Sequence, residues 1–124
     1  MSFNWSEYLA LAGQLAGKAK ISATQESRLR SAISRAYYAA FIQARNHLRD
    51  KDGLSLPRLN IHQYVINRFK NDPDLTRQKI GSNLKIIRYN RNRADYDDKI
   101  ERLPAKTKRT LKVAAKVIAD LQSL

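Results

Sequence analysis

The chain has 124 residues, no cysteine and a formal net charge of +13 at pH 7, because 24 Lys and Arg oppose 11 Asp and Glu. The lack of cysteine excludes disulfides, thiolate metal ligands and a cysteine nucleophile. The hydrophobic fraction of 43% is ordinary for a globular protein, and the longest apolar run, residues 36–42, is far shorter than a membrane span. We therefore expect one cytoplasmic domain over residues 1–124 with negatively charged partners, nucleic acid before an acidic protein. A basic surface without a specific partner is the plain alternative.

The first predicted element is a helix that begins at Asn4 and ends near Gly17. Asn4 is the expected N-cap, and Glu7, three residues later, completes a capping box. Phe3 and Tyr8 occupy the two positions of a hydrophobic staple. A glycine directly after the last helical residue is a common helix terminator.

The second predicted helix is the longest, with Ser22 and Gln25 as its expected capping pair and residues 50–53 as its end. Its apolar residues recur at helical spacing over about five turns, which predicts one continuous buried face. They are Leu29, Ala32, Ile33, Ala36, Tyr37, Ala40, Phe41, Ala44 and Leu48. The alanines in this stripe favour close approach of a neighbouring helix.

A connector over residues 54–60 leads to a short third helix over residues 61–69. Asn60 and Gln63 are its possible capping pair. A break at residues 71–73 separates it from the next helix, because Pro73 cannot continue the third one.

The fourth helix is expected from about Leu75 to Arg93, followed by a charged loop over residues 95–103. Pro104 suits the first turn of the last helix. The expected inward face of that helix comprises Leu111, Ala114, Ala115, Ile118 and Leu121, and the expected outward basic ridge comprises Lys108, Lys112 and Lys116. These elements predict an all-α, single-domain bundle of four to five helices.

An arginine interrupts the apolar stripe of the fourth helix. Ile80, Leu84, Ile87 and Arg91 step by four, three and four residues, so Arg91 falls where a hydrophobic residue is expected. A guanidinium keeps its charge and is costly to bury alone. Arg91 must therefore reach water, pair with a carboxylate or hold an anion. Further polar groups follow within about one helical turn, and they are Asn92, Asp95 and Tyr96.

Arg35 and Tyr38 flank the stripe of the second helix. If the second and fourth helices are neighbours, Asp95 or Asp98 is in a position to pair with Arg35 and orient the loop.

Two segments resemble motifs of a known family. Residues 30–41 (RSAISRAYYAAF) and 91–96 (RNRADY) are similar to the HEPN superfamily of small helical bundles, and Phe3, Trp5, Tyr8 and His62 add to the likeness. The resemblance implies a bundle that is commonly a homodimer, with the arginine motifs of two subunits facing each other across a cleft. It also implies a metal-independent ribonuclease, in several members a toxin paired with a nucleotidyltransferase-type antitoxin protein.

Carried onto this chain, the resemblance implies that Arg91 stabilises the phosphate attacked by the RNA 2′-hydroxyl and that Asn92 positions it. The family's histidine has no counterpart, because its slots hold Tyr96, Asp97 and Asp98. Tyr96 is then expected to hydrogen-bond or stack, and His62 supplies proton transfer if it reaches Arg91. The expected contacts to the RNA backbone are Arg88, Arg93, Lys108, Lys112 and Lys116. The protein is either a ribonuclease toxin or a degenerate relative that binds RNA without cleaving it.

A second hypothesis is a non-enzymatic interaction module that forms a homodimer and docks an acidic partner such as a nucleotidyltransferase. Arg91 is then structural and held by Asp95 and Asp98. Scattered glycines and the lack of metal-ligand spacing lead us to expect no cofactor and no metal. His47, near the end of the second helix, is expected to carry partial positive charge that suits the helix dipole.

Overall fold

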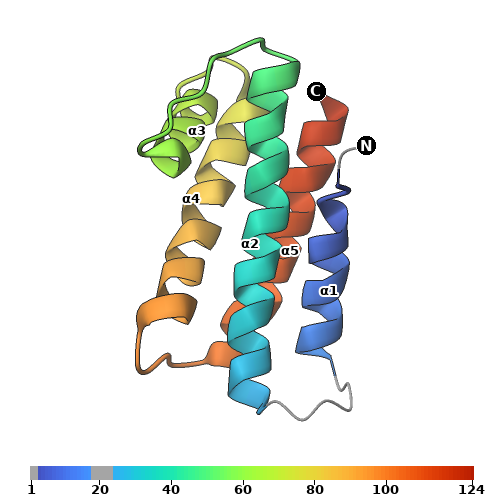
Figure 1. Cartoon of the computed structure of the whole chain (residues 1–124), viewed down its shortest axis with the longest axis vertical. Helices are drawn as coiled ribbons and strands as arrows, with labels where there is room; N and C mark the ends of the chain where they lie inside the picture. The colour runs from blue at the N-terminus through green and yellow to red at the C-terminus, as the bar shows by residue number, and fades with distance from the viewer. Residues whose placement is uncertain (1–2, 18–23) are drawn as a thin grey trace.

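The computed structural model describes residues 3–17 and 24–124, which form an all-α bundle, as predicted. Four of the helices stand side by side, and the third helix along the chain packs beside the upper part of the fourth (Figure 1). The helices are α1 (Ser6–Ala16), α2 (Gln25–Asp50), α3 (Ile61–Lys70), α4 (Leu75–Tyr96) and α5 (Leu103–Ser123). Within the described ranges there is no strand, and no helix is both long and apolar enough to cross a membrane.

Helix α2 lies at the centre and contacts each of the other four helices. All nine residues of its predicted apolar stripe are buried, which confirms the periodicity. Ala39 and Ile42 are buried as well, so the apolar face is wider than predicted. The fully buried alanines leave room for α1, α4 and α5 to pack closely around α2.

The predicted helix caps are partly wrong. The N-cap of α1 is Trp5, while the Asn4 side chain accepts a hydrogen bond from the Ser6 amide at 3.1 Å. Phe3 and Tyr8 do meet edge to face, with ring centroids 5.6 Å apart, and α1 ends before Gly17 as predicted. Because the Asn4 side chain bonds to a backbone amide only two residues ahead, Asn4 lies before the N-cap position, which Trp5 occupies.

The cap of α2 is Thr24, whose hydroxyl accepts from the Ser27 amide at 3.2 Å. Ser22, half of the predicted capping pair, lies outside the described residues. The predicted Asn60–Gln63 pair is wrong, because Asn60 is left-handed (φ 56°) and makes no side-chain capping bond. An asparagine tolerates that conformation, so it serves the turn into α3 through its backbone.

Helix α4 runs three residues further than predicted, so Asp95 and Tyr96 are helical and do not belong to a loop. Two ion pairs with i,i+4 spacing, which begin at Arg91 and Arg93, stabilise the last turns of α4. The free carbonyls at this helix end are satisfied by Arg30 of α2, which donates to the carbonyls of Ala94 (3.0 Å), Asp97 (2.6 Å) and Asp98 (3.2 Å). A guanidinium from another helix therefore extends α4.

Helix α5 has Pro104 in its first turn, as predicted, but it begins at Leu103, which was predicted to be the last residue of the loop. Ala115 is exposed, which corrects its assignment to the inward face, and Val117 is buried in its place. The buried face of α5 is centred near Ala114 and Val117, which lie three residues apart, and Ala115 therefore falls outside it. The lysine ridge (Lys108, Lys112 and Lys116) is exposed, as predicted.

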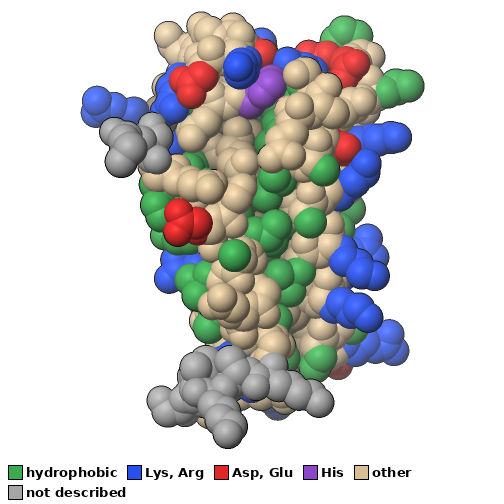
Figure 2. All heavy atoms as spheres, turned by 90° about the vertical axis from the view of Figure 1, so that its right-hand side faces the viewer, with side chains coloured by type: hydrophobic (Ala, Val, Ile, Leu, Met, Phe, Trp, Pro, Cys, Tyr) green, Lys and Arg blue, Asp and Glu red, His purple; other side chains and the backbone are tan. Residues whose placement is uncertain are grey.

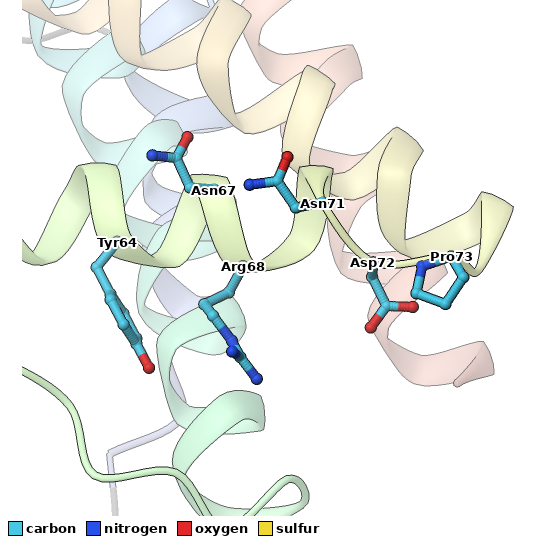
Figure 3. Close-up of a pocket in the computed structure, with 6 residues that line it drawn as sticks. All are labelled: Tyr64, Asn67, Arg68, Asn71, Asp72 and Pro73. Carbon is cyan, nitrogen blue, oxygen red and sulfur yellow. The ribbon is translucent and has the colours of Figure 1, made fainter.

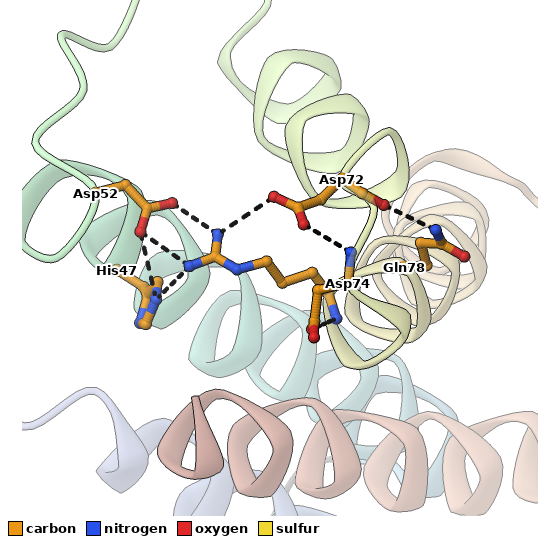
Figure 4. Close-up of polar contacts among 6 residues, drawn as sticks. His47, Asp52, Asp72, Asp74 and Gln78 are labelled. Carbon is orange, nitrogen blue, oxygen red and sulfur yellow. Dashed lines mark hydrogen bonds and ion pairs between the residues drawn. The ribbon is translucent and has the colours of Figure 1, made fainter.

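Arg77, in the first turn of α4, contacts Asp52 just after α2 and Asp72 just after α3, two residues that are labelled in Figure 4. Its two terminal nitrogens donate to the Asp52 carboxylate at 2.7 and 2.9 Å, and the Asp72 carboxylate lies 4.0 Å away. His47 Nε2 is 3.3 Å from the same guanidinium. Burial lowers the pKa of His47, which corrects the prediction of a partly positive imidazole at this helix end.

Candidate functional site

Arg91 lies on the inner side of α4 with 14% of its side chain exposed. Its guanidinium donates to three partners: Nε to the Asp95 carboxylate at 2.9 Å, Nη1 to the Asn92 side chain at 3.0 Å and Nη2 to the Tyr38 hydroxyl at 2.7 Å. Arg91 therefore does place a positive charge against the core. One carboxylate, one amide oxygen and one hydroxyl oxygen accept its hydrogen bonds and compensate the cost of burial.

The aromatic rings of α2 form the floor beneath this guanidinium. The Arg91 Cζ atom lies 5.0 Å from the Tyr38 ring centroid and 5.8 Å from that of Tyr37. Both distances are within the range of a cation–π interaction. Three of the five N–H hydrogens of Arg91 are used, so one hydrogen on each terminal nitrogen can still donate to a ligand.

A polar groove of about 380 Å³ lies between α2 and α4, and Arg91 adjoins it through two hydrogen-bond partners and does not line it. We call it the α2–α4 groove. Its lining comprises Ser27, Arg30, Ser31, Ser34, Arg35, Tyr38, Ala94 and Asp95. Tyr38 and Asp95, which line it, are also hydrogen-bond partners of Arg91. The two motifs that are far apart in the sequence therefore meet at one groove.

Arg35 does not form the expected ion pair with Asp95 or Asp98. Its guanidinium lies 5.1 Å from the ring centroid of Tyr8 in α1, and within the described ranges no carboxylate pairs with it. Asp95 is taken by Arg91, and the loop at Asp98 is oriented by Arg30. Sequence reasoning missed Arg30, although it opens the RSAISRAYYAAF segment.

His62 belongs to the same aromatic cluster but does not touch Arg91 through a hydrogen bond. Its Nδ1 is 2.6 Å from the Tyr37 hydroxyl, and its ring stacks on Phe41 with centroids 4.1 Å apart. Burial, with the positive charges of Arg88 and Arg91 nearby, lowers the pKa of His62 to about 4. Burial also raises the pKa of Tyr37, so its hydroxyl stays protonated at neutral pH.

We expect the His62 imidazole to titrate near pH 4, well below its ordinary value of 6.5. Since the unfolded chain binds this proton first as pH falls, the neutral ring contributes stability above pH 6.5, and that contribution is lost progressively as pH falls toward 4. An NMR titration of the imidazole carbon shifts measures the midpoint directly. A midpoint at 6.5 or above would show that His62 is solvated and is not part of the cluster.

The remaining predicted residues are spread over several faces. Arg93 pairs with Asp97 at 2.9 Å and lies over the Tyr89 ring, and Tyr96 is 75% exposed at the end of α4. Arg88 faces α3, where it lines a second groove. The lysine ridge points away from α2 and α4, because α5 packs its opposite face against them.

Another hollow, of about 400 Å³, lies along α3 and the turn into α4 (Figure 3). Tyr64 and Arg68 point to one side of α3, whereas Asn67 and Asn71 point to the other. Asp72 adds a carboxylate to this lining. Among the described residues, no three His, Asp or Glu side chains converge as metal ligands here or elsewhere.

Comparisons of the chain with protein-family models, with curated proteins and with solved structures found no match. Over residues 3–17 and 24–124, the structure defines the class of protein as an all-α bundle of five helices with a polar groove between α2 and α4.

Proposed function

We propose that this protein binds RNA through the α2–α4 groove, with Arg91 contacting a backbone phosphate. The observation that carries the proposal is the state of Arg91: it is held on two tyrosine rings beside a polar groove and keeps two N–H donors unused. A guanidinium positioned in this way suits an oxyanion, because the protein has already fixed its orientation.

The surroundings of Arg91 suit a ribonucleotide. Ser31 and Ser34 offer hydroxyls along one side of the groove, and Arg35 adds a second guanidinium without a carboxylate partner among the described residues. Asn92 is exposed beside Arg91, and exposed Tyr96 provides a ring on which a base can stack. This arrangement is consistent with the likeness of segments 30–41 and 91–96 to the HEPN superfamily.

The basic surface strengthens the electrostatic part of this binding. Figure 2 shows a column of Lys and Arg side chains down one edge of the molecule, whereas most Asp and Glu in view gather near the upper end. The exposed lysine ridge of α5 faces away from the α2–α4 groove, so it adds to the overall positive charge of the molecule and not to the lining of the groove. Because each neutralised phosphate releases counterions, the affinity should fall steeply with salt.

The chemistry of the site favours binding over cleavage. Hydroxyls of tyrosine and carboxylates of aspartate, which occupy the slots of the missing motif histidine, are poor proton shuttles at neutral pH in their ordinary states. His62 is engaged through Nδ1 by Tyr37, and its lowered pKa makes it a weak base. We therefore propose the non-cleaving form of the RNA-binding function.

Incubation of the purified protein with defined RNAs in EDTA tests both parts of the proposal. We expect intact RNA, and a filter-binding titration in which log affinity falls linearly with log salt. The absence of binding, or binding that does not depend on salt, contradicts the RNA-binding proposal. Cleavage that persists in EDTA and disappears in Arg91→Ala contradicts only the non-cleaving part, and supports a ribonuclease toxin.

One observation favours the alternative of an interaction module. Arg91 joins α2 to α4 through Tyr38 and Asp95, as a purely structural residue also would. Tyr89 and Tyr96, both exposed on α4, then offer an apolar surface to a second copy of the chain or to a nucleotidyltransferase-type antitoxin. In this case Arg91→Ala leaves RNA affinity unchanged and lowers the free energy of unfolding.

A further inference from the structure

A second groove, of about 210 Å³, lies between α3 and α4, and Arg88 is one of its lining residues. We call it the α3–α4 groove. Gln63, Ile66, Asn67 and Lys70 line it from one face of α3, and Lys85 and Arg88 line it from α4. Its volume is about seven times that of one water in the liquid and below the range of about 300 to 1,000 Å³ typical of drug-sized ligands. The groove therefore suits a small group.

Three cations and no carboxylate line this groove. In the described part of the chain, Lys70, Lys85 and Arg88 make no ion pair, and their side chains donate no hydrogen bond. The hollow shown in Figure 3 differs in this respect, because Arg68 there faces a lining that includes the Asp72 carboxylate. Uncompensated charges gathered in one concave place favour an anion.

The guanidinium of Arg88 gives the strongest sign. Its Nε atom is buried and has no hydrogen-bond partner among the described residues, a state that is costly for a charged donor. The positive charge of Arg88 contributes to the lowered pKa of His62, so the two side chains are close enough to interact electrostatically. Of the two α4 residues that line the groove, Arg88 is half-buried, whereas Lys85 is exposed.

We propose that the α3–α4 groove binds a phosphate monoester. A dianion with several acceptor oxygens matches two lysines, one arginine and the side-chain amides of Gln63 and Asn67 better than a singly charged carboxylate does. The source is the terminal phosphate of an RNA strand or a free phosphomonoester. Only the first source rests on the proposed RNA binding; the phosphate site itself stands without it.

The full chain is titrated with inorganic phosphate at constant ionic strength, and the Arg88 Nε–H cross-peak is followed by NMR. We expect this cross-peak to move with phosphate and not with chloride. Lys85→Gln should weaken phosphate binding at least about tenfold, because it removes one charge-assisted hydrogen bond. Lys79→Gln removes the same charge from an exposed site on α4 outside the groove and should change the affinity less than about twofold.

An unchanged cross-peak, or equal losses in the two lysine variants, would overturn the phosphate site. RNA with a phosphorylated end and RNA with hydroxyl ends are then compared on wild type, Lys85→Gln and Arg91→Gln. A gain from the end phosphate that Lys85→Gln loses and Arg91→Gln keeps supports the RNA end as ligand. Phosphate binding without that gain overturns the RNA end and leaves the free phosphomonoester. Failure of RNA binding in every form removes the proposed function and not the phosphate site.

Discussion

Phe69→Ala is expected to lower the free energy of unfolding by about 3 to 5 kcal/mol, the usual cost of deleting a fully buried aromatic ring. Phe69 is 0% exposed and belongs to the main core. Helix α3 has only ten residues and buries only Val65, Ile66 and Phe69, so loss of the ring removes the largest anchor of this helix. Because α3 also carries His62 and one wall of the α3–α4 groove, both should be disturbed.

Urea unfolding followed by circular dichroism measures this change. Leu59→Ala is the control, because Leu59 is 81% exposed and its truncation should alter the free energy of unfolding by no more than about 0.5 kcal/mol. Equal effects of the two substitutions would contradict the packing of α3 against the bundle.

Gly81→Ala is expected to destabilise the fold by about 1 to 3 kcal/mol even though alanine is the better helix former. A Cβ at Gly81 would lie 2.5 Å from the Lys70 backbone nitrogen and 2.9 Å from the Ile66 carbonyl oxygen. Both atoms belong to the backbone of α3, so relief requires the two helices to separate. The substitution should therefore also widen or distort the α3–α4 groove, which Ile66 and Lys70 line.

Gly13→Ala is the matched control, since nothing lies within 4 Å of a Cβ at that position in α1. There the helix preference alone acts, and we expect stabilisation by up to about 1 kcal/mol. Thermal unfolding of the two variants should move in opposite directions. Stabilisation of both would show that α3 and α4 do not approach each other as described.

The sequence allowed the bundle and its central helix to be predicted, because burial follows the helical period in α2 almost residue by residue. The end of α4 was predicted too early because its determinant, Arg30, lies 64 residues before the Ala94 carbonyl that it satisfies. The N-cap of α2 was predicted at Ser22, whereas the hydroxyl of Thr24 accepts the capping hydrogen bond, because nearby hydroxyl residues have similar capping chemistry.

The sequence allowed the location of the candidate site to be predicted, but not the contacts among its side chains. The misplaced charge at Arg91 follows from the stripe alone, but its contact with Tyr38 depends on the register between α2 and α4. The α3–α4 groove was not predicted, since its lysines and Arg88 come from two helices whose relative position no local pattern reveals. From the sequence, Arg88 was expected only as one of several residues that contact the RNA backbone.

The most direct test of the proposed function is the salt dependence of RNA affinity in Arg91→Gln, measured beside wild type by filter binding. If Arg91 contacts a phosphate, the substitution should weaken binding by about 1 to 3 kcal/mol and reduce the salt slope by about one. Arg49→Gln, which removes the same charge from an exposed, Asp50-paired arginine at the other end of α2, should change both quantities far less. If both variants have the same affinity and the same salt slope, and circular dichroism shows that both are folded, Arg91 does not contact an RNA phosphate.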